Sequence, residues 1–82
     1  MNIYVGNLSF DATEEDMRKA FEAFGEVSSS TIVKDRMTGK SRGFGFVVMP
    51  DKSQGEAAVN GMNGKDLMGR TVKVNEAKPR PA

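Results

Sequence analysis

Two residue types with reactive side chains are missing from this chain of 82 residues, which contains no cysteine and no histidine. Without cysteine the chain can form neither a disulfide nor a catalytic thiolate. Without histidine it cannot build a zinc site of the Cys/His type, a histidine-dependent catalytic triad or an imidazole base. The sequence also offers no convincing acid–base pair. We therefore expect no enzymatic activity, no cofactor and no metal site.

Long apolar runs are missing as well. No stretch approaches the roughly 20 consecutive apolar residues of a membrane-spanning helix, and no signal peptide precedes the first expected strand. We therefore expect a cytoplasmic protein that makes no contact with a membrane. The chain has the length of one domain and is long enough to bury a modest core.

Charge of one sign does not dominate, because the formal net charge is only +1. The charges are nevertheless unevenly distributed: residues 1–33 carry six acidic and two basic side chains, whereas residues 65–82 carry five basic and two acidic ones. Residues 34–45 are also basic. A local basic region is what phosphate binding requires. The alternative is that these runs are ordinary solvated faces, and charge alone does not decide between the two interpretations.

The chain does contain a stretch in which phenylalanines and glycines alternate, at residues 42–49, with the sequence RGFGFVVM. Successive side chains of a strand point to opposite faces, so Phe44 and Phe46 share one face while Val47 and Met49 share the other. Val47 and Met49 suit a core, which leaves the two phenylalanines facing outward. The glycines beside them would let a partner approach closely. A small soluble domain rarely exposes large apolar side chains side by side without a use for them.

Residues 3–8, with the sequence IYVGNL, alternate in the same way. Ile3 and Val5 face one side and Tyr4 faces the other. If the two strands are neighbours, Tyr4, Phe44 and Phe46 form one exposed aromatic platform.

These two stretches carry a resemblance to a known family. Residues 42–49 resemble the RNP1 octamer of the RNA recognition motif, written K/R-G-F/Y-G/A-F-V-x-F/Y. Met49 departs from that pattern, which has Phe or Tyr there, but it has inward parity and so bears on the core rather than on the platform. Residues 3–8 resemble RNP2 of the same family. The resemblance runs from about Asn2 to Lys78, and the chain also resembles short bacterial RNA-binding proteins with a single such motif.

The resemblance implies a role for four side chains. The residues that match Tyr4 and Phe46 stack on successive bases. The residue that matches Phe44 packs against the sugars between those bases, and the residue that matches Arg42 meets a phosphate.

The periodicity of the remaining sequence predicts the order of the elements. Strands are expected at residues 2–6, 27–34, 42–49 and 71–77. The first helix is expected to be capped by Thr13 and ended by Gly25, and the second to begin with a capping box of Ser53 and Glu56. The order strand, helix, strand, strand, helix, strand predicts an α+β fold, a ferredoxin-like βαββαβ sandwich. In it, a four-stranded antiparallel sheet has two helices on one face, and the platform lies on the other.

Three residues of these elements bear on the core. Phe21 and Phe24 follow Met17 at helical spacing, opposite a charged face, so we expect them to pack against the sheet rather than to contact a ligand. Ser30 shares its parity with Ile32 and should point inward, where its hydroxyl needs a hydrogen-bond partner to avoid a loss of stability.

The last expected strand and the tail supply further candidate residues. Lys73 and Asn75 face outward, and each either hydrogen-bonds a base edge or is an ordinary exposed strand residue. Asn7 and Lys78 are weaker candidates. The predicted RNA-binding residues are Tyr4, Arg42, Phe44, Phe46, Lys73, Asn75, Asn7 and Lys78.

The sequence therefore predicts a single-stranded RNA-binding module, with a domain at residues 1–78 and a flexible tail at residues 79–82. Its expected task is post-transcriptional regulation or RNA chaperoning, as a monomer. Single-stranded DNA remains open as a partner. The alternative function is a protein-interaction or self-association module that uses the same face of the sheet.

Overall fold

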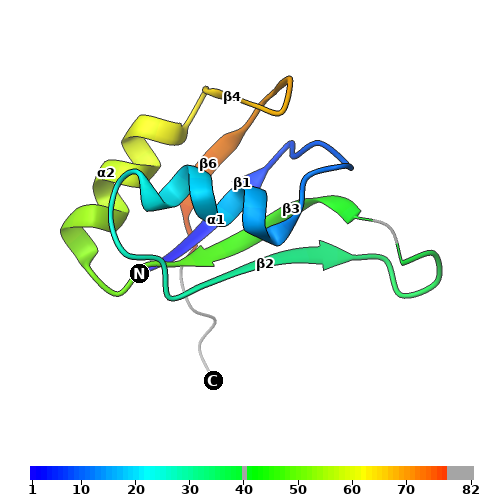
Figure 1. Ribbon diagram of the computed structural model, residues 1–82, viewed down its shortest axis with the longest axis horizontal. Coiled ribbons are helices and arrows are strands. Elements are labelled where there is room, and N and C mark those ends of the chain that lie inside the picture. The colour runs from blue at the N-terminus through cyan, green and yellow to red at the C-terminus, as the bar shows by residue number, and fades with distance from the viewer. Residues whose placement is uncertain (40, 78–82) are drawn as a thin grey trace.

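The computed structural model describes residues 1–39 and 41–77, without the side chains of residues 41 and 42. Four strands form one antiparallel sheet in the order β2-β3-β1-β6, and two helices lie along it (Figure 1). A hairpin of two very short strands forms a second, small sheet. The elements are β1 (Asn2–Gly6), α1 (Glu14–Glu22), β2 (Ser29–Lys34), β3 (Ser41–Val48), α2 (Lys52–Met62), β4 (Asp66–Leu67), β5 (Arg70–Thr71) and β6 (Lys73–Glu76).

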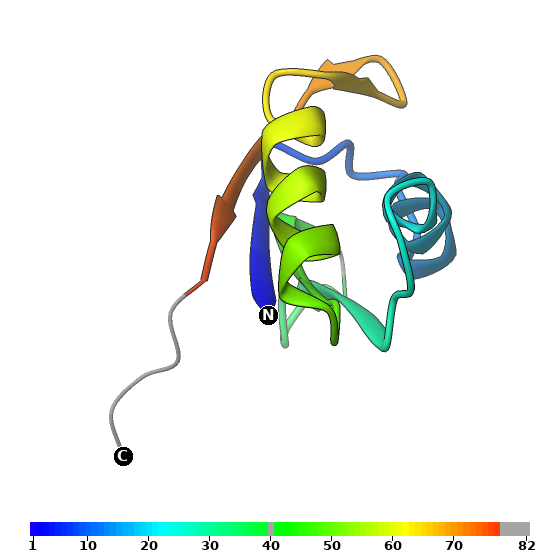
Figure 2. The same cartoon turned by 90° about the vertical axis from the view of Figure 1, so that its left-hand side faces the viewer.

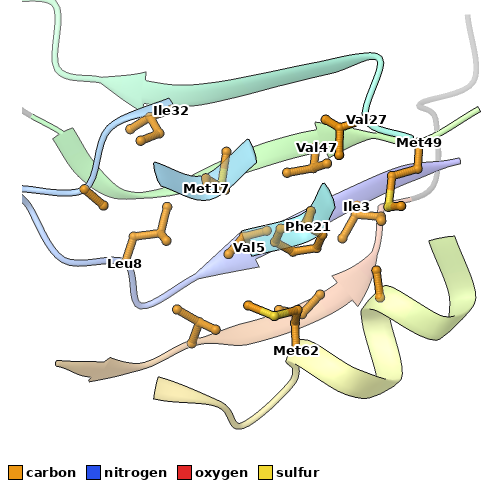
Figure 3. Close-up of a cluster of buried hydrophobic side chains, with 14 residues drawn as sticks. Ile3, Val5, Leu8, Met17, Phe21, Val27, Ile32, Val47, Met49 and Met62 are labelled. Atoms are coloured by element: carbon orange, nitrogen blue, oxygen red, sulfur yellow. The ribbon is translucent and has the colours of Figure 1, made fainter. Parts of the chain in front are cut away.

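Both helices cover the same face of the sheet (Figure 2). Their apolar side chains and the inward side chains of the strands form one buried cluster (Figure 3). Val47, Met49 and Phe21 are completely buried in it, and Phe24 packs against it. The opposite face of the sheet has no helix over it in the described part of the chain. The ferredoxin-like βαββαβ sandwich predicted from the sequence is confirmed.

The first helix begins where the sequence predicted and ends earlier. Thr13 is its N-cap, because the Thr13 hydroxyl accepts a hydrogen bond from the Asp16 amide and the Asp16 carboxylate accepts one from the Thr13 amide, both at 3.1 Å. These hydrogen bonds lower the pKa of Asp16 below its ordinary value of 3.8. The C-cap is Ala23. Gly25 therefore lies two positions after the cap, whereas a glycine that ends a helix usually lies one position after it. A Cβ atom on Gly25 would collide with the Gln54 side chain. Gly25 therefore makes room for α2.

The start of the second helix was predicted wrongly. Its N-cap is Asp51, whose carboxylate accepts a hydrogen bond from the Gln54 amide at 3.0 Å. Ser53 and Glu56, the expected capping box, lie inside the helix. Two capping signals therefore stood close together in the sequence, and the one nearer the preceding strand is used.

The end of the chain differs from the single strand expected at residues 71–77. Thr71 belongs to β5 and pairs with Asp66 of β4, and the Thr71 hydroxyl donates a hydrogen bond to the Asp66 carboxylate at 2.9 Å. Of β4, β5 and β6, only β6 joins the four-stranded sheet. Ser30 points inward as predicted, and its hydroxyl donates to the backbone carbonyl of Glu14 at 2.9 Å. The expected boundary between a domain and a tail falls on residues outside the described part of the chain.

Candidate nucleic-acid interface

The pairing of β1 with β3 brings three aromatic rings together on the open face of the sheet. Tyr4 lies directly opposite Phe46, and Gly6 lies opposite Phe44. The ring centroids are 6.0 Å apart for Tyr4 and Phe44, 5.9 Å for Tyr4 and Phe46, and 6.3 Å for Phe44 and Phe46. We call Tyr4, Phe44 and Phe46 the aromatic platform.

Alternation along β3 decides which of its side chains lie on the same face of the sheet as the platform. Phe46 is 38% exposed, whereas Val47 on the other face is fully buried. Tyr4 and Phe44 are half-buried, partly because the rings cover one another. The rings thus expose apolar surface to solvent, whereas the core on the other face of the sheet is buried.

Three glycines lie near the aromatic rings, and two of them, Gly43 and Gly45 beside Phe44, were expected to let a partner approach closely. A Cβ atom on Gly6 would lie 2.7 Å from the Tyr4 hydroxyl oxygen, so this glycine lets the Tyr4 ring lie along its own strand. Gly45 faces the core, and a Cβ atom there would collide with the carbonyl oxygen of Thr31 in β2. Gly43 adopts a left-handed backbone with φ of 86°. Gly6 and Gly45 therefore serve close contacts within the protein, rather than the close approach of a partner.

The edge strand β6 adds polar groups beside the platform. Asn75 lies opposite Tyr4 and Lys73 lies opposite Gly6 in the pairing of β1 with β6. Both side chains are exposed, and their parity is opposite to that of the buried Val72 and Val74. The two predicted candidates on the last strand therefore share a face with the three rings.

Asn7 is held by contacts within the protein. Its backbone is left-handed, with φ of 58°. The Asn7 amide nitrogen donates to the Thr71 carbonyl at 2.6 Å, and its amide oxygen accepts from the Arg70 guanidinium at 2.9 Å. Asn7 thus ties the end of β1 to β5, and its predicted contact with RNA stays a prediction. The side chain of Arg42 and all of Lys78 lie outside the described residues.

Two candidate residues were missed by the sequence analysis. Phe10, in the loop between β1 and α1, is 65% exposed, and the central carbon of the Arg70 guanidinium lies 5.9 Å from its ring centroid. Phe10 stands apart from the helical spacing of the core residues, in a polar connection, and that isolation was a usable signal. Nothing in the sequence linked it to Arg70, which is 60 positions away in the chain.

The described residues also bear on two other kinds of site. Among residues 1–39 and 41–77, no group of three or more acidic side chains is placed to hold a metal ion. Within the same ranges neither helix has the length and apolar character needed to cross a membrane.

Comparison with known proteins then identifies the family. The family model described as the RNA recognition motif matches residues 3–73. This chain belongs to the RNA recognition motif family. The RbpE protein of Nostoc sp. (strain PCC 7120 / SAG 25.82 / UTEX 2576) is 46% identical over 80 residues, which are 98% of this chain and 81% of RbpE.

Solved structures of RNA recognition motifs agree with this fold. The crystal structure of RNA-binding protein PG1 is 43% identical, with a TM-score of 0.93 over 100% of this chain and 99% of that one. The Sxl-lethal protein/RNA complex is 29% identical, with a TM-score of 0.90 over 98% of this chain and 48% of that one. The sheet and helices of this RNA recognition motif are thus also found in a protein solved together with RNA.

Proposed function

We propose that this protein binds single-stranded RNA by stacking bases on the aromatic platform. The observation that carries the proposal is the cluster of three rings, with centroids about 6 Å apart, on the face of the sheet away from the helices. Stacking of a base on an aromatic side chain contributes about 1–3 kcal/mol per base. PG1 is named as an RNA-binding protein and the Sxl-lethal protein was solved with RNA, which supports the same function here.

In this proposal each of the named side chains makes a distinct contact with the RNA. Tyr4 and Phe46 stack on two successive bases, and Phe44 packs against the sugars between them. Arg42 meets a phosphate, and Lys78 is a weaker candidate for a contact with the RNA. Base edges are bound by Lys73 and Asn75, which lie beside Tyr4 and Gly6, with Asn7 as a weaker contact.

In this proposal the protein is a cytoplasmic monomer that binds RNA and catalyses no reaction. Lys34, the last residue of β2, and Arg36, in the connection that follows it, are both exposed. They attract the phosphate backbone over a longer range, and added salt screens this attraction. A duplex is a poor ligand because its bases are already stacked on each other. RNA chaperoning and post-transcriptional regulation both fit such a mode of binding.

A titration tests the proposal. Labelled single-stranded RNA of mixed sequence is titrated at two salt concentrations with the wild type and with the Phe44→Ala/Phe46→Ala double variant. The matched control is Met68→Ala, because Met68 is 48% exposed but lies in the turn between β4 and β5. We expect salt-sensitive binding that the double variant loses and the control keeps.

Two results would contradict the proposal. Binding that survives in the double variant would mean that basic loops rather than stacking hold the RNA. A folded wild type that binds no RNA would favour the alternative, a protein-interaction or self-association surface on the same face.

A further inference from the structure

We infer that the platform continues into an additional nucleotide subsite, formed by Phe10 and Arg70 at the end of the sheet where β1 stops. Its occupant is the next nucleotide of the single-stranded RNA that crosses the platform. This inference rests on the proposed function and names two side chains outside the RNP1 and RNP2 stretches.

The subsite is a hollow at the edge of the platform. Tyr4 and Phe44 line it on the platform side, and Phe10, Arg70 and Lys73 also line it. Its volume is about 570 Å³, within the roughly 300–1,000 Å³ of small-ligand sites. Figure 1 shows the β4–β5 hairpin and the loop after β1 at the same end of the sheet. An RNA strand that leaves Tyr4 or Phe44 in that direction enters the hollow directly.

Phe10 is an exposed ring on an anchored loop. Leu8 and Ala12, two residues before and after it, are buried, and the Leu8 amide donates to the Gly43 carbonyl at 2.8 Å. The Ala12 amide donates to the Ser9 carbonyl at 3.0 Å. The loop is therefore fixed on both sides of Phe10, and a base that stacks there does not have to order it first.

Arg70 is oriented toward the same place. It stacks over the Phe10 ring at 5.9 Å and donates a hydrogen bond to the Asn7 amide oxygen at 2.9 Å. Asn7 is held in turn by the Thr71 carbonyl. A guanidinium carries several N–H donors, and in the described part of the chain no carboxylate forms a salt bridge with Arg70 or Lys73.

This chemistry fits a nucleotide better than a protein segment. An exposed ring beside two cations offers a stacking surface for a base together with charge for its phosphate. The carboxylates that would recognise a basic peptide are absent from the lining of the hollow.

The test compares short and long RNAs. Single-stranded RNAs of two to six nucleotides are titrated with the wild type, Phe10→Ala, Phe10→Leu and Phe10→Tyr. Phe10→Ala and Phe10→Leu should bind the hexanucleotide roughly 5-fold or more weakly, the effect of losing one stacked base. Their affinity for the dinucleotide should stay at the wild-type value, and Phe10→Tyr should match the wild type at every length because it keeps the ring.

Phe46→Ala separates this inference from the proposed function. If it leaves all affinities unchanged, the platform itself is refuted. If it weakens every RNA while Phe10→Ala matches the wild type at every length, only the subsite is refuted. Phe10→Ala that weakens the dinucleotide and the hexanucleotide equally would also refute the subsite, because the ring would then act by supporting the platform.

A measurement on the wild type avoids any dependence on how the variants fold. The Arg70 side-chain Nε–Hε resonance is followed by NMR during titration with the same RNAs. We expect it to shift with the hexanucleotide and to stay in place with the dinucleotide. A resonance that does not move with bound hexanucleotide would overturn the inference.

Discussion

Phe46 and Val47 are neighbours in β3 whose side chains lie on opposite faces, so replacing each with alanine should damage a different property. Val47 is fully buried and Phe46 is 38% exposed. Val47→Ala should lower the free energy of unfolding and leave RNA affinity unchanged. Phe46→Ala should lower RNA affinity and leave a folded protein.

The expected loss of stability in Val47→Ala follows from its burial. The change removes two carbon groups from the core, worth about 0.8 kcal/mol each in transfer from water. The cavity left behind adds to this, for a total of about 2–3 kcal/mol. At about 0.05–0.15 kcal/mol per residue, that is a large share of the stability of a domain of this length. The melting temperature should fall by roughly 4–8 °C for each kcal/mol lost.

Phe46→Ala removes a ring that is partly solvated already. Its two edge-to-face neighbours, Tyr4 and Phe44, contribute about 0.5–1.5 kcal/mol per pair at most. The RNA complex should lose about 1–3 kcal/mol because one stacked base loses its partner. In affinity this is roughly 5- to 150-fold.

Urea unfolding followed by circular dichroism gives the stability of both variants, and fluorescence anisotropy with labelled RNA gives their affinity. The binding is measured well below both melting temperatures, so that Val47→Ala is folded. An unfolded Phe46→Ala beside a Val47→Ala as stable as the wild type would show that β3 presents the opposite faces, and the reasoning would fail.

Three further variants test single features of the structure. Gly43→Ala places a side chain on a left-handed residue and should cost about 1–2 kcal/mol of unfolding free energy, so an unchanged urea midpoint would refute that strain. Because the pKa of Asp16 is lowered in the folded state, its contribution is present above the unfolded pKa and lost as pH falls through the folded value. Below about pH 4 the wild type should therefore lose stability more steeply than Asp16→Ala, and parallel pH profiles would contradict this. Asn7→Gly keeps the left-handed backbone but loses the hydrogen bonds to Thr71 and Arg70. Its melting temperature should drop in line with about 1 kcal/mol for each bond lost, and an unchanged value would show that these bonds do not stabilise the fold.

The sequence predicted the platform because alternation in a strand is a local rule. The parity of Phe46 and Val47 follows from position alone, and so does the inward direction of Ser30. The partner of Ser30, the carbonyl of Glu14, belongs to another element, and no local pattern contains it. The adjacency of β1 and β3 was only a condition of the predicted platform, since nothing in either strand by itself specifies its neighbour.

The remaining differences arise where tertiary contacts decide. Gly45 was expected to admit a partner, but it admits the backbone of β2, because inward parity matters more for it than its place beside two phenylalanines. The N-cap of α2 is Asp51, and its position depended on where the chain leaves β3. The pairing of Phe10 with Arg70 joins the loop after β1 to β5, and only the completed fold brings these two segments together.

Base stacking on the platform has a direct spectroscopic test, because Tyr4 is the only tyrosine of a chain without tryptophan. Fluorescence excited above the phenylalanine absorption therefore comes from the platform alone. Unlabelled single-stranded RNA should quench this emission to saturation, and the same strand annealed to its complement should quench it far less. RNA that binds, as shown by a label on the strand, while the Tyr4 emission stays unchanged would contradict stacking on this face of the sheet.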